Sequence, residues 1–241
     1  MAKDLMMRRQ DLIANPTPRV PICLVLDCSP SMSGEVSMGS VVQQTAPRPI
    51  DELNEGIKVF FSTIQEDEVA RYAAEISIVA FSELAEEVLD FDSVARVSPP
   101  KVELETQHGG TSIGNGVALA LSLLDRRKTE YRDAGIDYFQ PWLVLMTDGQ
   151  PTDDTHIDVA RKVVDLVNNK RLTVFPIGIG EGADMNVLAM FSPKRPPLRL
   201  KGMRFKEFFE WLSKSVSTTS QSIPGNNIPL DIEGLKGWSE L

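Results

Sequence analysis

The sequence predicts an α/β domain built on a doubly wound, mostly parallel sheet flanked by helices. Two observations predict it: short, continuous apolar runs rich in β-branched residues, and amphipathic stretches of helical period that separate them. Such runs are typical of strands covered on both faces, and their alternation with helices indicates crossover connections between parallel neighbours. Because ligands of these sheets bind beyond the carboxyl ends of the strands, a functional site is expected there.

The predicted elements follow one another along most of the chain. The predicted strands are residues 22–26 (ICLVL), 76–81 (ISIVAF), 142–147 (WLVLMT) and 172–179 (LTVFPIGI). Each predicted helix carries apolar residues three and four positions apart, which gives it one core-facing side. These residues are Ile50, Leu53, Ile57, Phe60, Phe61 and Ile64, then Ile113, Val117, Leu121 and Leu124, then Ile157, Ala160, Val164 and Val167, and finally Phe205, Phe208, Phe209, Leu212 and Val216.

The domain organisation is read from where this alternation begins and ends. We predict one domain over residues 20–220, with an N-terminal extension at 1–19 and a C-terminal tail at 221–241 that contains proline and glycine. One segment inside the domain, residues 36–48, interrupts the alternation and is interpreted as an insert. A chain of 241 residues is long enough for one large domain with a full core.

Composition and charge argue against several classes of partner and of site. The net charge is −9, from 34 acidic and 25 basic residues, so we expect no nucleic-acid partner. No apolar run approaches the roughly 20 residues that cross a bilayer, so we expect no membrane span. The N-terminus lacks the apolar stretch of a secretory signal, which favours a cytoplasmic protein. Cys23 and Cys28 are too far apart for a disulfide if the chain between them is extended, and with only two histidines a zinc site is disfavoured.

Five oxygen-bearing residues form the candidate site. Asp27, Ser29 and Ser31 alternate directly after the first strand, in the segment DCSPS, so their side chains can face one way while the chain is extended. Two later loops add Thr111, in HGGTS before a helix, and Asp148, in MTDGQ after another buried strand. Carboxylate and hydroxyl oxygens are ligands of a hard cation such as Mg²⁺, which takes six oxygens. The sequence therefore predicts a divalent-cation site.

These three segments, in this order, resemble the metal-ion-dependent adhesion site of the von Willebrand factor A family, a D-x-S-x-S stretch followed by a threonine and an aspartate on later loops. The resemblance covers residues 20–218, and in DCSPSMSGE, ELNEGI, GGTSIGNGV and MTDGQPTD the chain is most similar to bacterial TerY-type tellurite-resistance proteins. It implies a Rossmann-like three-layer sandwich and a bound Mg²⁺, Mn²⁺ or Ca²⁺. It also implies a protein partner that presents an Asp or Glu carboxylate to the ion, and a non-enzymatic role in a bacterial stress or tellurite-resistance system.

The chain departs from the family pattern in three places. Pro30 stands where a glycine is usual between the two serines, and Cys28 places a thiol inside the motif. The third departure is the segment from Val36 to Arg48, which separates the serine motif from the helix that follows. We interpret the thiol as inert packing. As a hypothesis, the insert shapes the choice of partner; the alternative is a tolerated surface insertion.

A serine esterase is the competing interpretation from another functional class. Gly110, Ser112 and Gly114 satisfy the G-x-S-x-G pattern, and Asp148 or Asp153 followed by His156 would complete the order Ser, Asp, His. The pattern requires a buried strand immediately before the serine, whereas the preceding segment KVELETQHGG is polar and ends in two glycines. The metal site is therefore the preferred interpretation.

Overall fold

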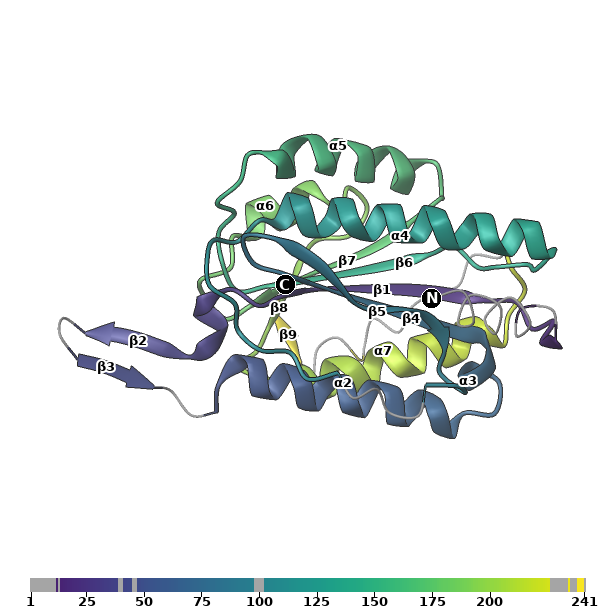
Figure 1. Ribbon diagram of the computed structural model, residues 1–241, viewed down its shortest axis with the longest axis horizontal. Coiled ribbons are helices and arrows are strands. Elements are labelled where there is room, and N and C mark those ends of the chain that lie inside the picture. Colours follow the sequence, from purple (N-terminus) through teal and green to yellow (C-terminus); the bar gives the residue numbers. More distant parts are fainter. Residues whose placement is uncertain are drawn as a thin grey trace.

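The structure is a computed structural model that describes residues 12, 14–38, 41–44, 47–97, 102–225, 234 and 238–240. Within this part, seven strands form one sheet in the order β5-β4-β1-β6-β7-β8-β9 (Figure 1). Neighbours from β4 to β8 are parallel, and β5 and β9 run antiparallel at the two edges. The strands are β1 (Val20–Asp27), β4 (Ala74–Phe81), β5 (Ala85–Ser93), β6 (Trp142–Thr147), β7 (Thr173–Ile179), β8 (Leu198–Leu200) and β9 (Ser239–Glu240).

Helices cover both faces of the sheet and make a three-layer sandwich (Figure 1). One face carries α4 (Ile113–Ala134), α5 (Thr155–Asn168) and α6 (Met185–Met190), and the other carries α2 (Pro49–Glu66), α3 (Ala70–Ala73) and α7 (Phe205–Ser220). Alternate residues of β1 divide between the two resulting cores: Ile22 and Leu24 join α2 and α7, while Cys23 and Val25 join α4 and α5. The predicted fold class is confirmed.

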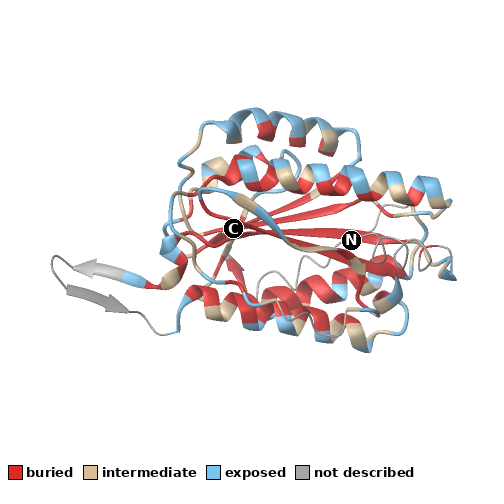
Figure 2. Ribbon diagram, viewed as in Figure 1, coloured by how far each residue is buried: buried red, intermediate tan, exposed pale blue. Residues whose placement is uncertain are grey.

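The four predicted strands are confirmed as β1, β4, β6 and β7, and all eight residues of β1 and of β4 are buried. Figure 2 shows that each long helix turns a buried side toward the sheet. The predicted core side of α5 is confirmed at Ala160 and Val167 and wrong at its other two positions, because Ile157 is 38% exposed and Val163, not Val164, is fully buried. Adjacent valines at 163 and 164 fit two helical registers equally well, and the sheet selects the one that also buries Val159.

The edge elements were not predicted. Strand β5 alternates irregularly between acidic and apolar residues and buries few of its side chains. Strand β9, near the end of the predicted tail, pairs with β8, and the ring of Trp238 packs 5.0 Å from that of Phe208 on α7. Cys23 and Cys28 are both free, as predicted, and both are buried. None of the helices in the described part is long and apolar enough to span a bilayer.

The predicted insert contains a β-hairpin. Strands β2 (Glu35–Met38) and β3 (Val41–Gln44) pair antiparallel with each other and form a sheet separate from the main one. Figure 1 shows the hairpin projecting away from the body of the domain, next to the short 3-10 helix η1 (Pro30–Ser33). The hairpin therefore lies beside the candidate site without adding to the core sheet.

Candidate metal centre

The carboxyl ends of β1 and β6 bring the first residues of the site together. These strands are parallel neighbours, with Leu26 opposite Met146, so Asp27 at the end of one lies beside Asp148, just past the end of the other. After Asp27 the chain turns into η1, which has Pro30 at its first position and is followed by Gly34 with a left-handed φ of 71°. Proline suits the first position of a helix, so the departure from the family's glycine helps to start this turn.

Hydrogen bonds connect four of the five predicted residues. The Ser31 hydroxyl donates to Asp148 Oδ1 over 2.7 Å, and the hydroxyl oxygens of Ser29 and Ser31 lie 2.9 Å apart. The backbone N–H of Ser29 donates to Asp27 Oδ1 over 2.8 Å. The two serines therefore bridge the two carboxylates, and all four side chains converge on the same edge of the sheet.

Thr111 reaches the site from the loop before α4. Its backbone is held by Thr152, whose Oγ1 accepts the Thr111 N–H over 2.9 Å and whose own N–H donates to the Thr111 carbonyl over 3.0 Å. A Cβ added to Gly149 would lie 3.2 Å from Thr111 Oγ1, so this hydroxyl rests against the turn that follows Asp148. Within the described chain Thr111 Oγ1 makes no hydrogen bond. The structure thus gathers all five predicted residues.

Asp27 is buried and Asp148 is half-buried, and neither carboxylate has a compensating positive charge among the described residues. Desolvation raises the pKa of Asp27 and, with a smaller contribution from the nearby charge of Asp27, raises the pKa of Asp148 to about 6. No lysine, arginine or histidine of the described residues forms an ion pair with either carboxylate. Buried charges are generally paired or bound to metals, so this arrangement fits a cation.

The chemistry of the donors selects the kind of cation. Among the described residues no three His, Cys, Asp or Glu side chains come together as a metal site, and this cluster instead combines two carboxylates with three hydroxyls. Oxygen-only donors suit Mg²⁺, Mn²⁺ or Ca²⁺ better than zinc. The neighbouring thiol of Cys28 is fully buried, and desolvation raises its pKa to about 12, so it stays protonated at neutral pH.

Thr147 is a further residue of the candidate site that the sequence did not lead us to predict. Its hydroxyl donates to Asp27 Oδ2 and accepts the N–H of Gly149 over 3.2 Å, so it fixes one carboxylate and the turn beside the other. Thr147 is fully buried at the last position of β6. A hydroxyl residue that ends a buried apolar strand directly before a predicted ligand was the signal available in the sequence.

We expect Thr147→Val to lower the affinity for Mg²⁺ about 10- to 100-fold, because losing an outer-shell hydrogen bond to a ligand typically has an effect of this size. Titration calorimetry measures the change. Thr147→Ser, which keeps the hydroxyl, should bind nearly as the wild type does. Thr218→Val, an exposed change on α7, is the matched control. Equal affinity of folded Thr147→Val and wild type would contradict this role.

The residues of the competing esterase interpretation lie nearby but are not joined by hydrogen bonds. Ser112 precedes α4, and the described segment 102–112 before it contains no strand. His156 Nδ1 pairs with the backbone carbonyl of Asp153, whose carboxylate accepts from the Thr155 hydroxyl. Asp148 is hydrogen bonded to Ser31. In the described structure, then, no Ser112–His156–carboxylate chain is formed.

Comparison with known proteins identifies a matching family and several solved structures of similar fold. A family model of the von Willebrand factor type A domain matches residues 22–206. The fold is similar to a von Willebrand factor type A protein from Catenulispora acidiphila (TM-score 0.61, 20% identity, 84% of this chain and 43% of that one). It is also similar to the pilus adhesin SpaC from Lactobacillus rhamnosus GG (TM-score 0.63, 14% identity, 84% and 31%).

A third similar structure holds a metal. It is proximal thread matrix protein 1 from the mussel byssus with a zinc-occupied MIDAS motif (TM-score 0.57, 17% identity, 83% of this chain and 48% of that one). The present chain spans less than half the length of each of these three chains. No curated protein matches it.

Proposed function

Because the chain belongs to the von Willebrand factor type A domain family, a family of general protein-interaction modules, we propose that it binds its partner through a divalent cation. The residues that would hold the cation are Asp27, Ser29, Ser31, Thr111 and Asp148. We propose Mg²⁺ as the ion, with Mn²⁺ or Ca²⁺ as substitutes. The partner is a protein that presents an Asp or Glu carboxylate.

One observation carries this proposal: Asp27 and the half-buried Asp148 are linked through Ser29 and Ser31 and form no ion pair with a described basic residue. A bound divalent cation supplies the missing positive charge and, since two carboxylates and three neutral hydroxyls satisfy it only in part, attracts a further anionic oxygen. Hydrogen bonds from Ser29 and Ser31 hold the two acidic side chains in position. Thr147 orients Asp27, and Thr152 holds the loop that carries Thr111.

The biological setting belongs to the same proposal. We propose a cytoplasmic protein without catalytic activity that acts in a bacterial stress or tellurite-resistance system of the TerY type. The resemblance of the sequence motifs supports this setting, and the pair of buried free cysteines suits a reducing compartment. A fluorophosphonate probe that labels Ser112 would count against the non-enzymatic assignment.

Calorimetric titration of wild type and Asp27→Ala with Mg²⁺ and with Mn²⁺ tests the metal site. We expect the substitution to lower affinity by more than the ~10- to 100-fold typical of losing an outer-shell partner, because Asp27 is a direct donor. Asp158→Ala, which removes a side chain that is 76% exposed on α5, is the matched control and should bind as the wild type does. Absence of binding to the wild type, or equal binding by wild type and Asp27→Ala, would defeat the proposal.

Partner binding is tested by affinity capture from bacterial lysate, with Mg²⁺ and with EDTA. The expected partner is retained by the wild type in Mg²⁺ and lost both in EDTA and with Asp27→Ala. Blocking carboxylates of the lysate proteins with a carbodiimide and an amine should also prevent capture. Retention of the same partner in EDTA would show that the interaction does not use the ion.

The β2–β3 hairpin offers a separate prediction about partner choice. Deleting residues 36–46 is expected to weaken partner capture and to leave Mg²⁺ affinity unchanged, because the hairpin projects beside the site and contributes none of its five predicted ligands (Figure 1). Calorimetry and capture on the same preparation separate the two effects. Unaltered capture would make the hairpin a neutral surface insertion.

A further inference from the structure

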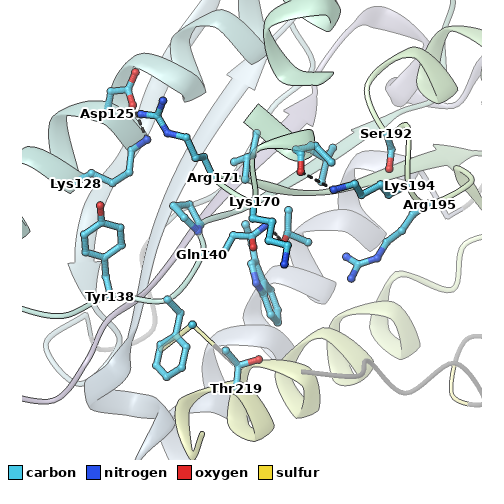
Figure 3. Close-up of a pocket in the computed structure, with 18 of the residues that line it drawn as sticks. Asp125, Lys128, Tyr138, Gln140, Lys170, Arg171, Ser192, Lys194, Arg195 and Thr219 are labelled. Carbon is cyan, nitrogen blue, oxygen red and sulfur yellow. Dashed lines mark hydrogen bonds and ion pairs between the residues drawn. The ribbon is translucent and has the colours of Figure 1, made fainter. Parts of the chain in front are cut away.

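A large pocket lies at the end of the sheet opposite the metal centre. It has a volume of about 650 Å³ and is lined by residues at the starts of β6 and β7, by the last turns of α4, and by the segments after α5 and α6 (Figure 3). Asp148 follows the last residue of β6, whereas Trp142, the first residue of that strand, lines the pocket. A strand of this length separates the two sites by about 20 Å.

The charge of this pocket opposes that of the whole chain. Its described lining contains six basic residues and one acidic residue, Asp125, although the chain has a net charge of −9. The basic residues are Lys128, Arg132, Lys170, Arg171, Lys194 and Arg195. They come from three segments far apart in the sequence, so the fold itself concentrates this positive charge. A concave basic site on an acidic protein attracts and retains anions.

Several of these cations have no carboxylate partner. The one acidic side chain is already occupied, because Asp125 forms an ion pair of 2.6 Å with Lys128. Lys194 donates to the backbone carbonyl of Val167 over 3.1 Å. In the described chain Lys170, Arg171 and Arg195 form no ion pair. Arg195 lies over the ring of Phe175, 5.3 Å from its centroid, and partial desolvation lowers its pKa.

The side chains of two of the unpaired cations point into one part of the pocket (Figure 3). Lys170 has a positive φ of 56° in the turn after α5, a conformation uncommon for a residue other than glycine. In Figure 3 the side chains of Lys170 and Arg195 extend toward the same part of the pocket, on the side of Thr219. Positive charges that converge without an acidic partner repel one another, and a bound anion relieves that repulsion.

We propose that this pocket binds a small anion carrying two or more phosphate groups, independently of the metal centre. Arginine forks and lysine ammonium groups are the usual protein donors to phosphate oxygens. A single phosphate matches at most two of the available charges, whereas an oligophosphate can contact Lys170 and Arg195 and extend toward the other basic side chains of the lining (Figure 3). The volume lies within the range of protein sites for small ligands.

Calorimetric titration with tripolyphosphate, pyrophosphate and orthophosphate, in EDTA and at low ionic strength, tests the proposal. We expect affinity to fall in that order and to weaken as salt is added, because the contacts are ionic. The variant Lys170→Asn with Arg195→Gln should lose about tenfold or more in tripolyphosphate affinity. Asparagine is chosen because it tolerates the left-handed backbone of residue 170.

Two comparisons make the result specific. Lys58→Gln with Arg161→Gln removes the same two kinds of charge from exposed helix positions outside the pocket and should bind as the wild type does. Asp27→Ala should also bind tripolyphosphate normally, so that failure of the metal site and failure of this pocket are distinguishable. The proposal is overturned by absent binding to the wild type, by equal losses in the pocket and control variants, or by orthophosphate binding as tightly as tripolyphosphate.

Discussion

Asp148→Asn is expected to abolish most Mg²⁺ affinity and, at the same time, to stabilise the metal-free protein at neutral pH. The affinity falls because a charged donor is lost; a decrease of more than about 100-fold is expected from a direct ligand. The stability rises because the wild type must keep a desolvated carboxylate ionised beside Asp27. We expect a gain of about 1–2 kcal/mol at pH 7, after allowing for solvent screening of this partly exposed group.

The raised pKa of Asp148 determines how its contribution to the free energy of unfolding changes with pH. The pKa of Asp148 is raised from an ordinary value of 3.8 to about 6 in the folded protein, so the folded state binds more protons than the unfolded state between these values. The contribution of this group to stability is therefore favourable at low pH, declines as pH rises from about 4 to about 6, and stays low above that range. The Asp148→Asn variant lacks this decline.

Urea denaturation in EDTA at several pH values measures the stability, and calorimetry measures the metal. Asp158→Asn is the matched control, because its carboxylate is largely exposed. In the wild type, Mg²⁺ should stabilise the fold above pH 6 and progressively less below it, since protons then compete for Asp148. A variant that is less stable than the wild type in EDTA at pH 7 would show that Asp148 serves the fold rather than the ion.

The core of the fold could be predicted because a strand that is buried on both faces appears in the sequence as a continuous run of apolar residues. Strands β1, β4, β6 and β7 are short, continuous apolar runs, which are typical of strands covered on both faces. Strand β5 could not be recognised, since an antiparallel edge strand with one exposed face carries acidic residues among its apolar ones. Strand β9 has two residues, too few for any periodicity.

The candidate site was predictable for a topological reason. Parallel strands end at the same edge of a sheet, so residues that follow β1 and β6 lie at that edge, and they meet because these two strands are neighbours. The hydrogen bonds of Thr147 to Asp27 and of Thr152 to Thr111 depend on the orientation of each hydroxyl group. That orientation is set by packing in the folded protein. The basic pocket could not be predicted either, since each pair of its cations alone is typical of a solvated helix face or turn.

Replacing Glu75 by alanine is expected to be strongly destabilising, although the residue lies far from the metal centre. Glu75 is fully buried near the start of β4, and its two carboxylate oxygens serve different partners. One oxygen accepts from Arg19 Nε over 3.0 Å, and the other accepts from Arg127 Nε over 2.6 Å and from the Tyr131 hydroxyl over 2.5 Å. Without the carboxylate, the buried guanidinium of Arg19 loses its counter-charge, and Arg127 keeps only its pair with the partly exposed Glu130.

Breaking a buried ion pair in this way costs about 3–5 kcal/mol, because an uncompensated charge remains in the interior. For a protein of this size the loss lowers the melting temperature by about 10 °C. Glu75→Gln keeps the shape and can retain one acceptor, so its effect should be smaller. Asp158→Ala breaks an exposed pair with Arg161 and should change stability by less than about 0.5 kcal/mol.

Thermal unfolding measures these losses, and Mg²⁺ titration of the folded Glu75 variants at low temperature adds a second criterion. Glu75 lies at the opposite end of β4 from Phe81, whose carbonyl accepts the Cys28 N–H beside the metal centre. Metal affinity should therefore stay unchanged while stability falls. A loss of stability similar to that of Asp158→Ala would mean that water reaches the two guanidinium groups. A parallel loss of metal affinity would mean that the two ends of the sheet are coupled through β4.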